Sequence, residues 1–211
     1  MYSKGLQVRE RITKAGARLF YEQGYDHTSF SDISRAVGIP PGNFYNHFKT
    51  KSAILDAVID YRLDDFRGRM QTWESDTRDP LCRLKRFVHM LRDNERDLVR
   101  FGCPMGGLNA ELRKLGVKQK NRARKMFEEF TDWLEREFRG IGCSADEARR
   151  HALYLITITQ GASTVAHVYG SREVLREKVD VIDRWLDAVA AEKKNVSAKP
   201  RSAAASTKKS R

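Results

Sequence analysis

Cysteine is scarce in this chain, and its placement limits the chemistry available. The 211 residues include three cysteines, Cys82, Cys103 and Cys143, which are too far apart for a C-x-x-C motif. Three cysteines cannot form a complete disulfide framework, and this spacing is not that of a metal or redox site. The first residues are followed by no apolar segment of the kind that directs export. We therefore expect a cytoplasmic protein in a reducing setting, without a metal or cofactor.

Catalytic motifs are also missing. The sequence contains no G-x-S-x-G, no P-loop and no G-x-G-x-x-G, and its five histidines show no metal-ligand spacing. An enzyme would need a base such as His89 or His151 beside a nucleophile, and nothing in the sequence pairs them. We predict that the chain is not an enzyme. The alternative of an enzyme or a binding protein that merely shares the helical fold stays open.

A membrane-embedded class is excluded by composition. Charged residues make up 32% of the chain and hydrophobic residues 40%, which also argues against disorder throughout. Residues 151–171 contain no Asp, Glu, Lys or Arg, which is long enough to suggest a membrane span. However, the threonines, serine, glutamine and histidines in that stretch make it too polar for lipid. It predicts a helix buried all round, in a core or in a subunit interface.

Positive charge is what the chain has in excess. The net charge is +12, and the isoelectric point is about 9.8. Such a balance makes a polyanion the first partner to consider. Residues 192–211 hold seven basic side chains and one acidic one, with almost no large apolar residue. They read either as a disordered basic arm that attracts nucleic acid or as a solubilising terminus without a task.

Apolar residues recur at helical spacing, and no segment alternates long enough to predict a strand. We expect an all-α fold of about nine helices. Their approximate ranges are 12–24, 29–37, 41–48, 51–66, 80–91, 108–115, 121–139, 144–170 and 171–191.

The first quarter of the chain has the spacing of a helix-turn-helix. Two short helices are joined by residues 38–41, so one would cross the DNA backbone and the next would enter the major groove. The amide of Asn43 can donate and accept hydrogen bonds, which suits adenine. Tyr45 and His47 are placed to reach phosphate oxygens, and Lys51 begins the next helix, where a phosphate is favoured. Phe44 and Phe48 are expected in the core.

Residues 11–55 resemble the tetracycline-repressor-like (TetR) transcription regulators. The segment reads RITKAGARLFYEQGYDHTSFSDISRAVGIPPGNFYNHFKTKSAIL. It follows the family pattern almost throughout, departing at Pro40-Pro41, where many members carry serine and a longer polar residue. By position, the resemblance implies phosphate contacts from Ser29, Tyr45, His47 and Lys51. It implies base-facing positions at Ser31, Pro41, Gly42 and Asn43.

The resemblance also implies a homodimer that pairs through its last two helices and carries an effector site. We divide the chain into a DNA-binding domain (1–52), an effector-binding and dimerisation domain (53–191) and a disordered basic tail (192–211). Residues 101–112 resemble a subgroup with G-C-x-x-G-x-x-x-x-E-L, in some members of which the cysteine senses electrophiles. Cys103 precedes a helix N-terminus, which favours thiolate. Reactive sensing, the lining of a pocket with Met105, and plain packing all stay open for Cys103.

The sequence thus predicts a ligand-responsive transcriptional repressor that binds a palindromic operator on double-stranded DNA as a dimer. Its effector would be a small molecule or an electrophile. The alternative is a non-specific or architectural DNA-binding protein that relies on its basic ends. Met70, Phe87, Phe130 and Tyr154 are candidates for pocket walls, although core packing is the simpler interpretation for each.

Overall fold

The structure is a computed structural model that describes residues 4–198. Within that range it contains ten helices and no strand, which confirms the predicted all-α class. The helices are α1 (Lys4–Gln23), α2 (Phe30–Val37), α3 (Pro41–Phe44), α4 (Lys51–Asp76), α5 (Pro80–Asp93), α6 (Glu95–Phe101), α7 (Pro104–Leu115), α8 (Lys120–Gly140), α9 (Ala145–Tyr169) and α10 (Arg172–Ala198).

Two capping boxes set the starts of α2 and α9. The Ser29 hydroxyl accepts the Asp32 N–H at 3.1 Å, and the Asp32 carboxylate accepts the Ser29 N–H at 2.8 Å. Ser144 and Glu147 repeat the arrangement before α9. There, the Lys193 ammonium and the Ser144 N–H and hydroxyl lower the pKa of the Glu147 carboxyl to about 2. Each box satisfies N–H groups that a helix start leaves without an intrahelical partner.

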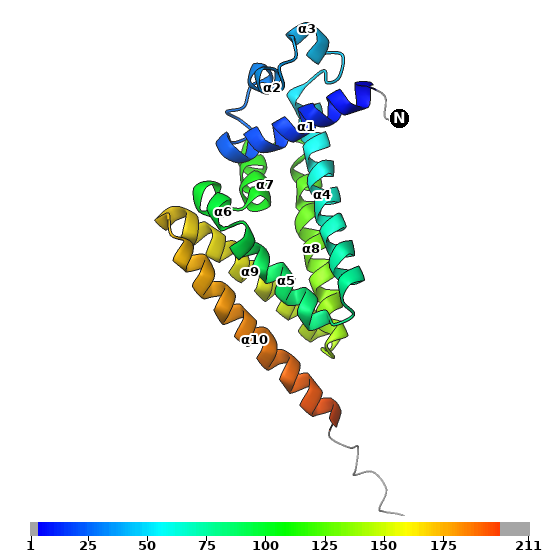
Figure 1. Ribbon diagram of the computed structural model, residues 1–211, viewed down its shortest axis with the longest axis vertical. Helices are drawn as coiled ribbons and strands as arrows, with labels where there is room; N and C mark the ends of the chain where they lie inside the picture. The colour runs from blue at the N-terminus through cyan, green and yellow to red at the C-terminus, as the bar shows by residue number, and fades with distance from the viewer. Residues whose placement is uncertain (1–3, 199–211) are drawn as a thin grey trace, which may run out of the picture.

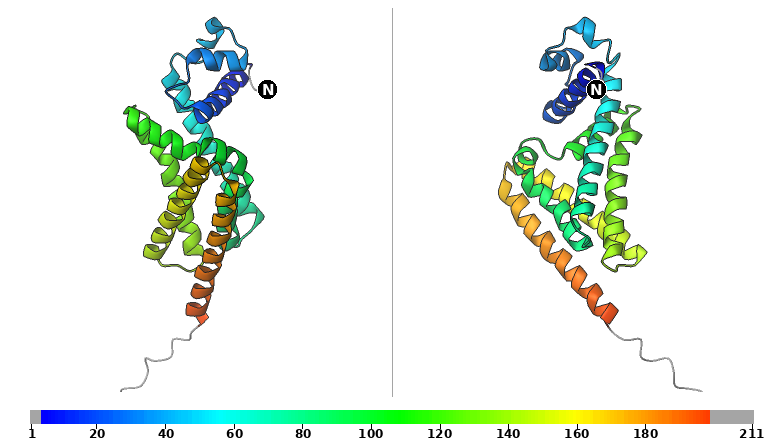
Figure 2. Two further views of the ribbon diagram at one scale, coloured as in Figure 1. Left: turned by 90° about the vertical axis from the view of Figure 1, so that its left-hand side faces the viewer. Right: turned by 45° about the vertical axis from the view of Figure 1, so that its right-hand side comes forward.

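The helices are arranged in an elongated molecule. In Figure 1, α1–α3 lie together at one end and α10 runs toward the other. Helix α4 has 26 residues, a length of about 39 Å, and leaves the α1–α3 end to run beside α8. The two further views in Figure 2 show the same separation of α1–α3 from α9 and α10. Helices α5 and α9 pack on α10, and α8 packs on α9.

Two apolar clusters form the core. The first joins α1–α3 to the first half of α4, and it also takes in Leu108, Leu112 and Met126 from α7 and α8. The second fills the space between α4, α5, α8, α9 and α10 around Trp133 and Phe138, which are both fully buried. The first cluster therefore continues past residue 52, where the sequence placed a domain boundary. The division into three parts stays a proposal.

The middle of the chain contains a helix that the sequence analysis did not resolve. Asn94, with φ −109° and ψ 18°, separates α6 from α5. Gly106 and Gly107, which precede the predicted helix 108–115, lie inside α7. That helix begins at Pro104 rather than near Leu108.

The far end of the chain is helical beyond the expected start of the basic tail. Helix α10 continues to Ala198, so residues 192–198 are helical rather than disordered. The remainder of the predicted tail, residues 199–211, lies outside the described residues.

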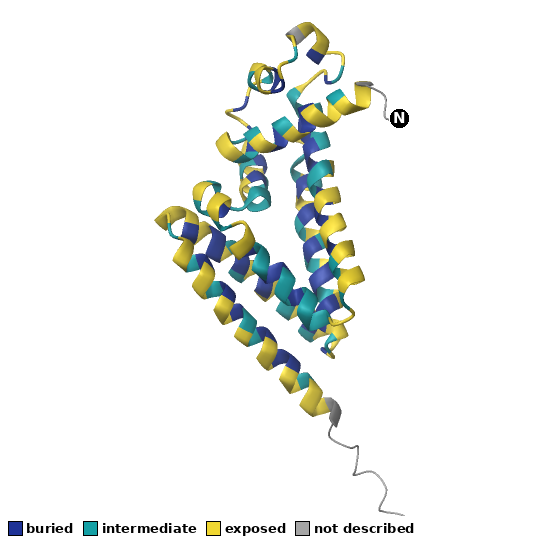
Figure 3. Cartoon of the chain, viewed as in Figure 1, coloured by how far each residue is buried: buried dark blue, intermediate teal, exposed yellow. Residues whose placement is uncertain are grey.

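Helix α9 buries one face and exposes the other. Ala152, Leu155 and Ala162 are buried, whereas Leu153 and Val168 are 60% and 71% exposed. Within a single chain, α9 is therefore not buried on all sides, as had been one expectation for residues 151–171. Figure 3 shows exposed residues along the outward side of α10 and at the end of α9 that meets it. Over the described residues, no helix is both long and apolar enough to cross a membrane.

Candidate nucleic-acid interface

The turn between α2 and α3 has the geometry of a helix-turn-helix. Gly38, with φ +67°, ends α2 in the left-handed conformation that glycine adopts at low cost. The Ser34 hydroxyl donates to the Ile39 carbonyl at 2.6 Å and fixes the turn. The Pro40 carbonyl then accepts the N–H groups of Asn43 and Phe44, both at 3.0 Å, and so begins α3.

Aromatic packing beneath the turn positions Tyr45. Phe44 and Phe48 are buried, as predicted. The Phe30 ring meets Phe44 edge-on, with ring centroids 4.6 Å apart, and stacks on Tyr45 at 5.0 Å with 23° between the ring planes. Tyr45 stays 49% exposed. Its ring is thus held against the core while part of the side chain faces solvent, as a phosphate contact requires.

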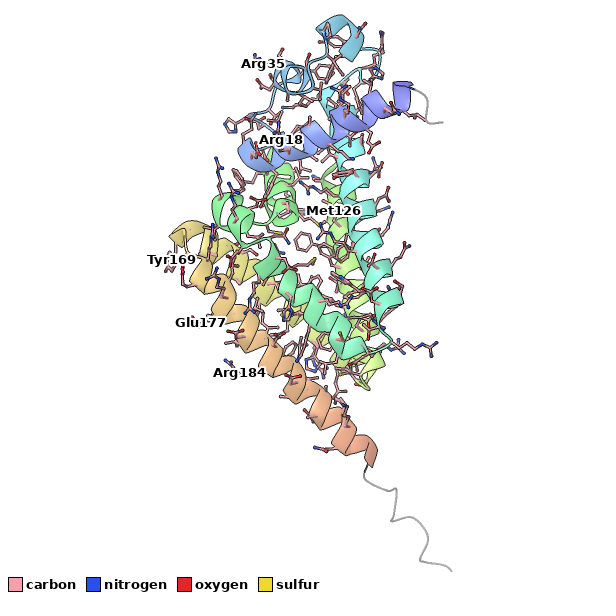
Figure 4. The ribbon with its side chains drawn as sticks, in the orientation of Figure 1. Arg18, Arg35, Met126, Tyr169, Glu177 and Arg184 are labelled. Atoms are coloured by element: carbon pink, nitrogen blue, oxygen red, sulfur yellow. The ribbon has the colours of Figure 1, made fainter. Side chains whose placement is uncertain are left out.

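The base-facing candidates lie together on α2 and α3. Ser31, Gly42 and Asn43 are exposed, and Pro41 is the first residue of α3. A Cβ atom at Gly42 would have no atom within 4 Å, so the surface there is open. Arg35 projects from the same end of the molecule, with 79% of its side chain exposed (Figure 4). This surface is open to a groove, and the base contacts themselves stay predictions.

Two of the predicted phosphate-binding residues have partners inside the protein. The Ser29 hydroxyl belongs to the capping box of α2. The Lys51 ammonium donates to the carbonyls of Tyr25 and Asp26, at 2.9 and 3.2 Å, and lies 4.4 Å from the centre of the Tyr25 ring. An ammonium group has three donors, so these two bonds leave one for a phosphate. His47 is half-buried, and its phosphate contact stays a prediction.

Two arginines of α1 that are not among the predicted DNA contacts hold this surface together. Arg9 donates to the His47 carbonyl at 2.7 Å, and its guanidinium carbon lies 4.0 Å from the centre of the Phe48 ring. Arg11 donates to the Val37 carbonyl at the end of α2, also at 2.7 Å. Their partners are 38 and 26 residues away, so local sequence patterns carry no signal for these contacts.

A second site lies in the body of the protein. A cavity of about 350 Å³ opens between α4, α5, α6, α7, α8 and α9, and Tyr21 of α1 also lines it. Cys103 and Met105 line it, as do Phe87 and Phe130. Tyr154 is 48% exposed, with its ring 4.9 Å from that of Trp185, and does not line it. The remaining lining residues are Arg62, Asp65, Phe66, Arg69, Met90, Leu91, Asn94, Asp97, Leu98, Pro104, Thr159, Gln160, Ser163.

The cavity exposes more apolar than polar surface, and its polar lining includes four charged side chains, Arg62, Asp65, Arg69 and Asp97. The Tyr21 hydroxyl donates to the Gly102 carbonyl at 2.7 Å, and burial raises the pKa of this phenol, so it stays neutral. The Cys103 sulfur accepts the Gly106 N–H at 3.3 Å and caps α7. Apolar and aromatic walls combined with polar groups that can orient a ligand are typical of small-molecule sites. Nowhere in residues 4–198 do three His, Cys, Asp or Glu side chains meet as a metal site would require.

The family resemblance is confirmed by comparison with known proteins. Residues 12–58 match the family described as "Bacterial regulatory proteins, tetR family". Residues 80–181 match "Transcriptional regulator LmrA/YxaF-like, C-terminal domain". Neither match bears on the G-C-x-x-G subgroup, which stays a prediction.

Individual relatives cover most of the chain. The transcriptional repressor DhaR of Mycobacterium sp. strain GP1 is 27% identical over 184 residues, which is 83% of this chain and 90% of that protein. A TetR transcriptional regulator from Chloroflexus aurantiacus has a TM-score of 0.76 and 26% identity, covering 87% of this chain and 96% of the other. One from Legionella pneumophila has a TM-score of 0.75 and 24% identity, covering 83% and 95%.

These relatives are transcription regulators rather than enzymes, which confirms that expectation from the sequence. The two family matches follow one another along the chain, with the tetR-family match over α1–α4 first and the C-terminal-domain match over α5–α10 second. The chain belongs to the TetR family of transcription regulators.

Proposed function

We propose that this regulator is a repressor that binds a palindromic operator as a homodimer and releases it when a small molecule or an electrophile occupies the cavity. The observation that carries the proposal is the placement of two separate features. An open helix-turn-helix surface lies at one end, and an apolar-walled cavity lies in the body, with α4 passing from one to the other. We expect the protein to act in the cytoplasm.

The outward faces of α9 and α10 support the homodimer. Leu153, Val165, Val168 and Tyr169 of α9 are between 42% and 73% exposed, and Val181 of α10 is 40% exposed. In Figure 4, Tyr169 lies at the end of α9. Large apolar side chains exposed along an uncharged stretch are typical of a subunit interface, and a two-fold axis would bury the same face of both chains. Pairing would also place two helix-turn-helix surfaces about 34–36 Å apart, or a multiple of that.

The cavity supports a response to a ligand. Its volume of about 350 Å³ lies in the range of small-molecule sites, and α4 contributes Arg62, Phe66 and Arg69 to its wall. A ligand that fits one position of α4 better than another would shift the DNA-binding helices at the other end of α4. It acts only through its difference in affinity for the two states. Cys103 faces this cavity, so an electrophile small enough to enter would meet its sulfur.

A competition experiment at raised salt concentration distinguishes specific from non-specific DNA binding. We expect DNA fragments selected from random sequence by the purified protein to outcompete scrambled fragments about 1,000-fold at roughly 0.2 M salt. Base contacts survive at that salt concentration, whereas binding through phosphates alone weakens steeply. Equal affinity for selected and scrambled fragments would instead favour an architectural protein that relies on its basic ends.

A further inference from the structure

Helix α7 reaches both the cavity and the DNA-binding domain. At its N-terminal end, Pro104 and Met105 line the cavity. Further along, Leu108 and Leu112 are buried in the apolar cluster that also holds Phe44. Met105 packs against both clusters of the core. In Figure 1, α7 lies between α6 and α1. A displacement of its first turn therefore has a direct mechanical route to α1–α3.

One carboxylate on α7 holds the backbone of the DNA-binding domain. Glu111 accepts the Tyr25 N–H at 2.9 Å through one oxygen and the Asp26 N–H at 2.8 Å through the other. Tyr25 and Asp26 follow α1 and lead to the cap of α2. Hydrogen bonds to a charged acceptor are about twice as strong as those between neutral groups. Glu111 thus connects the second half of α7 to the segment that joins α1 and α2.

The same two residues are held from the opposite side by α4. Lys51 donates to their carbonyls, at 2.9 and 3.2 Å. The N–H groups of residues 25–26 therefore point to a carboxylate on α7, and their carbonyls point to an ammonium at the start of α4. We refer to Glu111, residues 25–26 and Lys51 together as the clasp. The clasp joins α4 and α7, which both line the cavity, to the turn between α1 and α2.

Glycine at position 24 makes the close approach possible. Gly24 has φ +89°, a conformation that residues with a side chain rarely adopt. A Cβ atom there would lie 3.2 Å from a Glu111 oxygen, which is tighter than an ordinary contact. Gly24 lies in the segment 11–55 that resembles the TetR family, and Glu111 is the acidic residue of the G-C-x-x-G-x-x-x-x-E-L segment. The clasp explains why a glycine stands at position 24 and a carboxylate at position 111.

We infer that Glu111 is the positioning residue through which occupancy of the cavity acts on the DNA-binding domain. This inference rests on the proposed function. A ligand that moves Cys103, Pro104 and Met105 tilts α7, because a helix moves as a rigid body over two turns. The Glu111 carboxylate then pulls or releases residues 25–26, and the angle between α1 and α4 changes. Operator affinity changes with that angle.

The clasp itself is tested by amide hydrogen exchange. We expect Glu111→Gln to speed the exchange of the Tyr25 and Asp26 amides about tenfold, because the neutral side chain can no longer accept both bonds as a charged pair of oxygens. The matched control is Glu128→Gln, which removes an exposed carboxylate paired with Arg124 on α8. It should leave both amides unchanged. Unchanged exchange in Glu111→Gln would overturn the inference.

Transmission is tested by filling the cavity. Ser163 is buried and lines the cavity on α9, so Ser163→Phe places a ring in the space where a ligand would sit. We expect Ser163→Phe alone to change the affinity for the selected DNA at least about tenfold. In a protein that already carries Glu111→Gln, the same substitution should change the affinity less than about twofold, because Glu111 no longer connects α7 to residues 25–26. If Ser163→Phe fails to fold, Met90→Trp on α5 fills the same cavity.

The outcomes separate the two claims. The same fold-change with and without Glu111→Gln would overturn the role of Glu111 while leaving a ligand-responsive regulator intact. If Ser163→Phe changes the DNA affinity in neither background, the role of Glu111 is also overturned, because the cavity would not be coupled to DNA binding. If the unmodified protein does not distinguish selected from scrambled DNA, the proposed function fails first and the inference fails with it.

Discussion

Leu153→Glu is expected to convert the protein to a monomer and to weaken operator binding about 100-fold. Leu153 is 60% exposed on the outward face of α9, within the stretch that lacks any charged residue. In a two-fold interface, the substitution would bring two carboxylates into an apolar surface, and facing like charges cost several kcal/mol. A monomer carries one helix-turn-helix surface and loses the second half-site. Sedimentation and DNA titration measure the two effects.

Leu115→Glu is the matched control for this substitution. Leu115 is also an exposed leucine, at 42%, but it ends α7 and lies outside the α9 and α10 faces. The same change in charge and size should leave the assembly state and the affinity close to those of the unmodified protein. A Leu153→Glu protein that stays dimeric would show that the subunits pair through another surface.

Phe44→Ala is expected to destabilise the DNA-binding domain by about 3–5 kcal/mol. Phe44 is fully buried, its ring meets Phe30 edge-on, and the Phe30 ring in turn supports Tyr45. Such a loss is a large fraction of the stability of an ordinary domain, which is about 5–15 kcal/mol. Denaturant unfolding gives the change in free energy, and DNA binding should fall with it.

The effect of Phe44→Ala should be confined to one end of the molecule. Phe44 belongs to the first apolar cluster, whereas the packing around Trp133 forms the second. Dimerisation through α9 and α10 should therefore survive. Phe44→Leu, which keeps most of the apolar volume, serves as the control and should cost much less. A cost of Phe44→Ala as small as that of an ordinary surface substitution, about 0.5 kcal/mol or less, would show that the ring does not support this domain.

Local signals made most of the helices predictable. Ser29 with Asp32 and Ser144 with Glu147 are capping boxes in which the partners are three residues apart, so they can be read directly from the sequence. Helix α6 was missed because it is separated from α5 only by Asn94, and no glycine or proline marks the boundary. In α7, the Cys103 cap and Pro104 at the first position begin a helix that continues through Gly106 and Gly107.

The contacts that hold the candidate site could not be predicted in the same way. Glu111 binds residues that lie 85 and 86 positions earlier in the chain, and Arg9 binds the carbonyl of His47, 38 positions later. These pairings exist only after α1, α4 and α7 have packed together. The resemblance to a known family placed Tyr45 and Asn43 on the surface, but the partners of Lys51 required the structure.

The central claim is that the surface of α2 and α3 reads DNA twice, once from each subunit. Hydroxyl-radical footprinting of a selected fragment tests this most directly. We predict two protected segments on one side of the duplex, with centres about 34–36 Å apart or a multiple of that, over inverted copies of one short sequence. A single protected segment, or protection spread evenly along the fragment, would contradict the claim.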